Sequence, residues 1–126
     1  MPLAAPIPQD RPLTDQEAEL VRWLLENGKP DAASFLTQLP LARVVTQCDC
    51  GCASINFAIA RVLPPVGAGM LILADYSWEA TDRLALGVFV FSCGGLLAGL
   101  EVWSAGEMYV PPSLPAIEVL RSLVVS

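Results

Sequence analysis

LALGVFVFSCGGLLAGLEVWS, residues 84–104, is the stretch that decides the fold of this chain. Gly94-Gly95 separates two segments rich in leucine, valine and phenylalanine, and a Gly-Gly pair in that setting is typical of a β-hairpin turn. We therefore predict strands at 84–92 and 96–104. A two-residue turn puts one set of apolar side chains on a common face, which we predict as the core: Phe89, Phe91, Leu96, Ala98, Leu100 and Val102.

Upstream of the hairpin, apolar residues alternate with small or polar ones, as in strands with one buried face. This pattern predicts strands from residue 41 into the cysteines that follow, at 55–60 and at 70–75, with a loop at 76–83. Prolines and glycines at 64–69 break the pattern between the second and third of these strands. The sequence therefore predicts an antiparallel sheet of about five strands in meander order.

The chain before the sheet has helical signals. Residues 14–17, Thr-Asp-Gln-Glu, fit a capping box that starts a helix, and Gly28 is placed to end it in the left-handed conformation. Pro30 fits the first turn of a second short helix, and Pro40 is expected to stop it. We expect an N-terminal helical hairpin, and with the sheet this gives an α+β fold.

The two ends of the chain are rich in proline. Four prolines within residues 1–12 predict a flexible arm without regular structure. Residues 13–126 are the right length for a single α+β domain. Prolines at 111–115 end the sheet region, and the apolar spacing after them allows a C-terminal helix.

Three of the four cysteines lie in the segment Cys48-Asp49-Cys50-Gly51-Cys52. If residues 49–51 form a three-residue hairpin loop, Cys48 and Cys52 face each other across it, and Thr46 pairs with Ser54. A turn at Gly51 would then bring these sulfurs toward the separation of about 3.8 Å that tetrahedral zinc requires.

Zinc is one of three interpretations of the cysteines. Its ligands would be Cys48, Cys50 and Cys52, with Cys93, Asp49 or a distant carboxylate as the fourth. The chain has no histidine and no second Cys pair, which disfavours zinc, and the charge of Asp49 disfavours a reactive thiolate. The third interpretation, cysteines packed as small apolar residues with no cofactor, is the one that we expect.

Composition excludes several classes of function. The net charge is −6, and the arginines are scattered singly, so we expect no nucleic acid binding. The longest uncharged run, residues 84–100, falls short of the roughly 20 residues that span a bilayer. No signal peptide is visible, so we expect a cytoplasmic protein without a membrane partner.

Hydrophobic residues make up 54% of the chain, which is more than a soluble monomer of this size needs. We expect no catalytic activity, because Glu101 stands alone in its strand and no paired acid and base can be placed. The expected function is protein–protein contact, with a homodimer as the first case, through a sheet face that carries Val88, Val90 and Trp103. A thiol-dependent enzyme or a small-ligand-binding domain is a weaker alternative.

The motif Val-Val-x-x-Cys-x-Cys-Gly-Cys-x-Ser-Ile-x-Phe at 44–57, followed by Gly-Val-Phe-Val-Phe and Leu-Ala-Gly-Leu-Glu-Val-Trp at 87–103, resembles a group of small uncharacterised bacterial proteins. The resemblance extends over most of residues 14–115. It implies a bacterial, cytoplasmic, single-domain protein. No catalytic or ligand residue is implied, because no activity is attached to the group.

Overall fold

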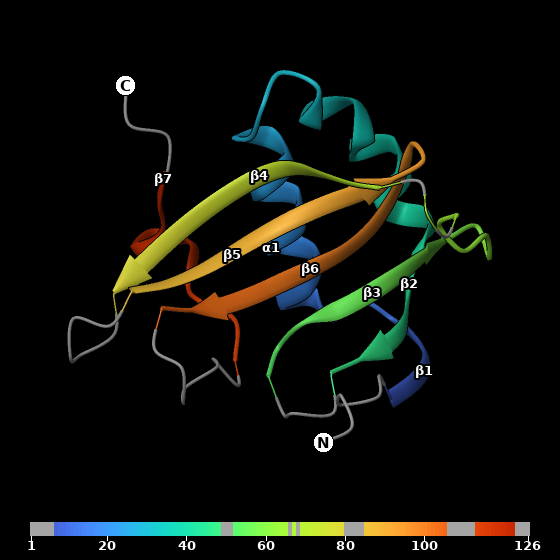
Figure 1. Ribbon diagram of the computed structural model, residues 1–126, viewed down its shortest axis with the longest axis horizontal. Coiled ribbons are helices and arrows are strands. Elements are labelled where there is room, and N and C mark those ends of the chain that lie inside the picture. The colour runs from blue at the N-terminus through green and yellow to red at the C-terminus, as the bar shows by residue number, and fades with distance from the viewer. Residues whose placement is uncertain are drawn as a thin grey trace.

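The computed structural model of this chain describes residues 7–48, 52–65, 67, 69–79, 85–105 and 113–122. In this part of the chain, seven strands form one antiparallel sheet: β1 (Ile7–Pro12), β2 (Ala42–Gln47), β3 (Ile55–Ile59), β4 (Met70–Glu79), β5 (Ala85–Cys93), β6 (Leu96–Ser104) and the two-residue β7 (Arg121–Ser122). Their spatial order is β1-β2-β3-β6-β5-β4-β7, with helices against the sheet (Figure 1). The fold class is α+β, as predicted.

Strands β2 to β6 correspond to the five that the sequence predicts, but they do not form a meander. β6 lies between β3 and β5, so the connection from β3 to β4 has to pass from the middle of the sheet toward its edge. β4 continues to Glu79, through part of the loop predicted at 76–83, and β7 pairs with it at Tyr76 and Ser77. The extra strands β1 and β7 both lie at sheet edges.

Residues 7–12 form an edge strand where the sequence predicts a flexible arm. β1 pairs antiparallel with β2, and its register shifts between Pro8 and Arg11. An edge strand needs N–H donors toward one neighbour only, so prolines are tolerated there. The prediction that these six residues lack regular structure is therefore wrong, and residues 1–6 lie outside the described part.

Helix α1 (Asp15–Glu26) begins at the predicted capping box. The N–H of Glu17 donates to the Thr14 hydroxyl at 3.1 Å, and the N–H of Thr14 donates back to the Glu17 carboxylate at 2.8 Å. The helix buries one apolar face, made of Leu20, Val21, Leu24 and Leu25. This face forms the core together with one side of the sheet.

The second helical segment is a 3-10 helix, η1 (Ala32–Leu41), so the predicted helical hairpin is wrong. Pro40 lies inside η1, where its missing N–H removes one α-helical hydrogen bond. The hydroxyls of Ser34 and Thr37 donate to carbonyls three residues earlier, at 2.7 and 3.4 Å. These local bonds compete with α-helical pairing and favour the tighter winding.

Polar bonds attach this helical layer to the sheet. The Gln38 side chain of η1 donates to the carbonyl of Gly95 at 2.9 Å and accepts from the N–H of Leu97 at 2.8 Å. The Tyr76 hydroxyl of β4 donates to the carbonyl of Asn27 at the end of α1. Helices and strands are therefore fixed in orientation by hydrogen bonds as well as by the apolar core.

The C-terminal segment is short. A three-residue 3-10 helix, η2 (Ile117–Val119), precedes β7 and packs against the core through Ile117. The predicted C-terminal helix is therefore a single turn within residues 113–122, and residues 123–126 lie outside the described part. In the part of the chain that the structure describes, no helix is long and apolar enough to cross a membrane.

Besides β1, whose register shift is described above, three strands each contain one extra residue, and these three bulges lie in a line across the sheet. The extra residues are Val45 in β2, Leu73 in β4 and Ala98 in β6. In β6, Gly99 pairs with Phe91 while Leu97 pairs with Ser92, which leaves Ala98 without a partner. A bulge reverses the faces of the residues beyond it and increases the local twist.

The Ala98 bulge changes which side chains are buried. Val88 and Val90 lie opposite Val102 and Leu100, and all four belong to the core beneath the helices. Phe89 lies on the other face of the sheet, together with Phe91. The predicted core face, which combines these phenylalanines with Leu100 and Val102, is therefore wrong, and so is the predicted exposure of Val88 and Val90, whose exposed fractions are 0%.

Gly28 ends α1 for a reason that the sequence does not reveal. The prediction that Gly28 adopts the left-handed conformation is wrong, because its φ is not positive. Instead, a Cβ atom there would lie 2.4 Å from the carbonyl oxygen of Leu73 and 2.8 Å from the Cβ of Ala74. The next residue donates its N–H to the same Leu73 carbonyl at 2.8 Å. Gly28 therefore allows the end of α1 to contact the backbone of β4 directly.

We predict that Gly28→Ala lowers the free energy of unfolding by about 2 kcal/mol, because the added methyl overlaps backbone atoms that cannot rotate away. Urea denaturation followed by circular dichroism measures the change. Glu26→Ala, an exposed substitution in the last turn of the same helix, should change stability by less than about 0.5 kcal/mol. Equal stabilities for Gly28→Ala and Glu26→Ala would contradict the close approach.

Candidate functional site

One face of the sheet carries no helix in the described part of the chain. Helices α1 and η1 contact strands β3 to β6 from one side, and in Figure 1 they lie behind the sheet. We call the opposite side the open face. From the register of the strands, its side chains are Asn56, Ile72, Asp75, Phe89, Phe91, Glu101 and Trp103.

Aromatic rings lie over glycines on the open face. Trp103 pairs with Gly87, and a Cβ on Gly87 would lie only 2.0 Å from the indole ring. Phe91 pairs with Gly99 in the same way, with its ring 2.7 Å from where a Cβ would be. The missing side chains let both rings lie flat on the sheet, so that they cover backbone and present an apolar surface.

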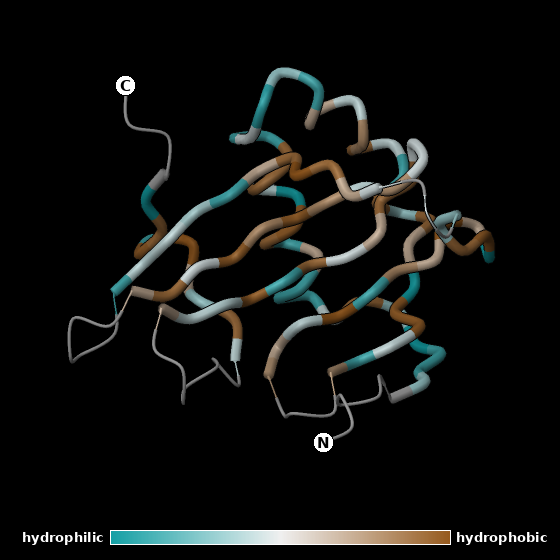
Figure 2. Tube along the Cα trace, viewed as in Figure 1, coloured by the Kyte–Doolittle hydropathy of each residue, from teal (hydrophilic) through white to brown (hydrophobic). Residues whose placement is uncertain are grey.

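An apolar groove of about 580 Å³ lies on the open face, between the strands and residues 63–65, 67, 69 and 70. Its floor includes Phe91 and Ala98, next to the line of bulges. Leu63 and Met70, at 64% and 55% exposure, are among the most exposed large apolar side chains of the described residues. Figure 2 shows hydrophobic positions in the segment after β3, at the right-hand end of the molecule.

The polar part of the groove is small. Asn56 donates from its side-chain amide to the hydroxyl of Thr46 at 2.7 Å, so these two groups are oriented by each other. Cys93 also lines the groove, at the end of β5. A groove with an apolar floor and a few fixed polar groups is suited to an apolar ligand or side chain.

Two carboxylates flank Phe89 on the open face. Asp75 in β4 and Glu101 in β6 both pair with Phe89 in β5, so their Cα atoms are about 10 Å apart. Burial raises the pKa of Asp75, an effect that the charge of nearby Lys29 offsets only in part, and burial also raises the pKa of Glu101. Glu101 is exposed, and Asp75 Oδ1 is buried without a hydrogen-bond partner among the described residues.

The structure describes three of the four cysteines predicted as zinc ligands, Cys48, Cys52 and Cys93. Cys48 donates its N–H to the carbonyl of Ser54 at 3.2 Å, so Cys48 lies opposite Ser54. The predicted register, with Cys48 opposite Cys52 and Thr46 opposite Ser54, is therefore wrong. Cys50 lies outside the described residues.

Cys93 lies far from Cys52 along the sheet. Ser54 is bonded to Val102, whereas Cys93 pairs with Leu96, six residues or about 20 Å away along β6. Cys93 therefore cannot share one zinc ion with Cys52. Among the described residues, no group of three or more Cys, Asp or Glu could hold a metal. A site that uses Cys48, Cys50 and Cys52 stays a prediction.

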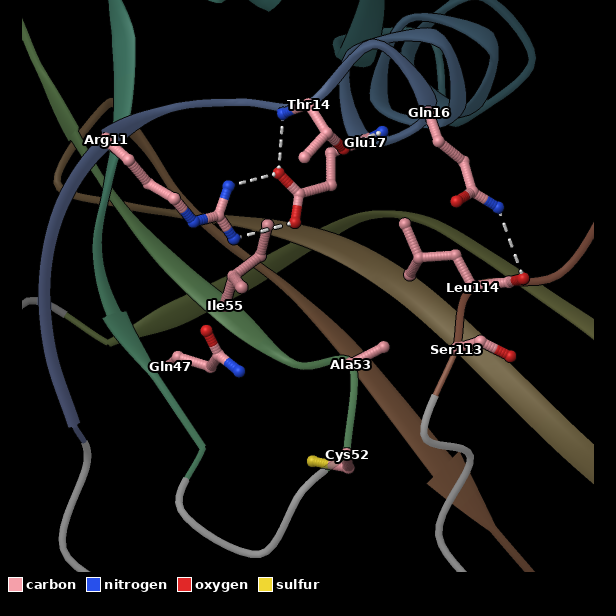
Figure 3. Close-up of a pocket in the computed structure, with 10 residues that line it drawn as sticks. All are labelled: Arg11, Thr14, Gln16, Glu17, Gln47, Cys52, Ala53, Ile55, Ser113 and Leu114. Atoms are coloured by element: carbon pink, nitrogen blue, oxygen red, sulfur yellow. Dashed lines mark hydrogen bonds and ion pairs between the residues drawn. The ribbon is translucent and has the colours of Figure 1, made fainter.

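A second, polar pocket of about 280 Å³ lies at the start of α1 (Figure 3). The Arg11 guanidinium binds both carboxylate oxygens of Glu17, at 2.8 and 3.0 Å. Cys52 lines the same pocket but is separated from the ion pair in the close-up, with Ile55 between them. The pair satisfies its own charges and joins β1 to α1, so we interpret it as structural.

The acid of this pair is held ionised. Burial by itself would raise the pKa of Glu17, but the hydrogen bonds from Arg11 and Thr14 and the charge of the guanidinium outweigh it and lower the pKa. A carboxylate with a lowered pKa stabilises the fold at neutral pH, and this contribution is lost as the pH falls through the folded-state pKa.

The chain was compared with models of protein families, with curated proteins and with solved structures. No match was found in any of the three comparisons.

We predict that Glu17→Gln lowers the free energy of unfolding by about 1 kcal/mol at pH 7, because the amide keeps the cap but loses the charge-assisted bonds to Arg11. The difference should disappear as the pH is lowered from about 5 to about 3. Urea denaturation across this range measures it. Glu19→Gln, at an exposed position of the same helix, should match the wild type throughout.

Ionisation of Asp75 affects the stability of the fold in the opposite direction to ionisation of Glu17. Its folded-state pKa is raised, so the ionised carboxylate destabilises the fold, and stability falls as the pH rises from about 4 through the raised pKa. We predict that Asp75→Asn raises the free energy of unfolding at pH 7 by about 0.5 kcal/mol, a small value because solvent screens a partly exposed charge. Asp31→Asn, an exposed control, should have no effect, and a destabilised Asp75→Asn would contradict this assignment.

Proposed function

We propose that this chain is a non-catalytic module that binds another protein through the open face of its sheet. The observation that carries the proposal is the contrast between the two faces. One face is covered by α1 and η1, whereas the other carries the partly exposed side chains of Phe89 and Trp103 and an apolar groove whose floor includes the buried Phe91. Apolar and aromatic surface of this kind marks contact sites on proteins.

The arrangement of polar groups favours binding over catalysis. Asp75 and Glu101 flank Phe89 at a Cα separation of about 10 Å and do not converge on one point. Acid and base catalysis requires groups that both reach the reacting atoms.

The proposed setting is the bacterial cytoplasm, as the sequence resemblance implies.

The proposal is tested with binders selected from a random peptide library on the immobilised protein. We expect the selected peptides to shift backbone amide signals of β5 and β6 at Gly87–Phe91 and Gly99–Trp103 in NMR spectra. Phe89→Ser should weaken their binding at least about tenfold, because it removes an aromatic anchor from the contact.

Val119→Ser is the matched control, since Val119 is 48% exposed but lies on η2. It should leave binding unchanged. Amide shifts confined to α1 and η1, or equal effects of the two substitutions, would place the contact elsewhere and reject the proposal.

A further inference from the structure

The apolar and acidic parts of the open face are neighbours. Phe91 lies in the groove, and Phe89 is two residues away on the same strand and the same face, with ring centroids 5.8 Å apart. The carboxylates of Asp75 and Glu101 belong to the residues on either side of Phe89. A ligand seated in the groove would therefore reach the acids within about two residues of extended chain.

These acids lack basic partners in the described part of the molecule. The ion pairs there join Arg11 to Glu17 and Arg43 to Asp10, and neither includes an acid of the open face. Lys29 lies near enough to Asp75 to affect its charge, but it donates no hydrogen bond to Asp75 Oδ1. A partly desolvated carboxylate without a basic partner gains from a cation that a binding partner brings to its exposed part, and both Asp75 and Glu101 are at least partly exposed.

Charge decides between the possible occupants of this face. A second copy would bring its own Asp75 and Glu101 against the same acids in a two-fold contact, and the chain already has a net charge of −6. Anionic lipid surfaces and nucleic acids are repelled for the same reason. A basic protein segment has the opposite charge and gains from both acids.

We infer that the partner is a protein segment that combines an apolar anchor, seated in the groove beside Phe91, with basic side chains that pair with Asp75 and Glu101. This inference rests on the proposed function, because it specifies the chemistry of the ligand of the open face. Recognition needs both parts: the groove gives the segment its position, and the acids select its charge.

Three synthetic ten-residue peptides with a fluorescent label provide the test by fluorescence anisotropy. The first alternates leucine with lysine, the second alternates leucine with glutamate, and the third alternates serine with lysine. We expect the leucine–lysine peptide alone to bind at micromolar concentration in 150 mM salt. The double variant Asp75→Asn/Glu101→Gln should weaken this binding about tenfold, which corresponds to two partly exposed charge pairs.

The control is the double variant Glu19→Gln/Glu26→Gln, which removes the same charge from exposed positions of α1. It should leave the affinity within about twofold, because distant exposed charges are screened. Equal weakening in both double variants would show unspecific attraction to an acidic protein and overturn the inference. The inference is also overturned if none of the peptides binds.

One outcome separates this inference from the proposed function. If the leucine–glutamate peptide binds as well as the leucine–lysine peptide, and Phe89→Ser abolishes both, the open face binds protein segments without selecting basic ones. The proposed function then stands and the inference fails. A dimer in light scattering that Phe89→Ser dissociates would identify a second copy as the occupant and would likewise reject the inference.

Discussion

The fold depends on one extra residue in β6. Because Ala98 has no partner in β5, the residues beyond it change faces, and Leu100 and Val102 join Val88 and Val90 under the helices. Without the bulge, phenylalanine and leucine side chains would share a face and valines would be exposed. This bulge therefore separates the valine and leucine side chains that β5 and β6 contribute to the core from the aromatic side chains that they place on the open face.

The bulges in β2 and β4 extend this irregularity across the sheet. Val45 and Ala98 both line the groove, and Leu73 follows Ile72, the residue opposite Phe91. Bulges bend and twist the strands that contain them, which is how a sheet becomes concave on one side. The groove therefore follows from the shape of the backbone, and residues 63–65, 67, 69 and 70 complete its lining.

Local sequence signals predicted local structure well. The capping box at Thr14, the Gly94-Gly95 turn and the positions of β2 to β6 were all visible, because each depends on neighbouring residues. The sequence did not reveal which side chains of β5 and β6 face the core, since a bulge at Ala98 leaves no signal in a run of apolar residues. The same limit applies to Gly28, whose role depends on a β4 backbone about 45 residues later in the sequence.

In the candidate site, too, local features were predictable from the sequence and long-range ones were not. The position of Trp103 outside the core was predictable from alternation, but its combination with Asp75 and Glu101 required the strand order, in which β5 separates β4 from β6. The zinc hypothesis rested on three cysteines that are close in sequence. Register then placed Cys48 opposite Ser54 and left Cys93 at the other end of the sheet.

The acids on the open face have a further physical consequence. An aromatic sheet face of this size would favour association with other sheets, and natural proteins prevent such contacts by placing charges within apolar surface. Asp75 and Glu101 flank the centre of the face, where stacked copies would have to desolvate four carboxylates at once. The same two groups that destabilise the isolated fold therefore keep an apolar surface available, so that it is closed only by a partner that brings the opposite charge.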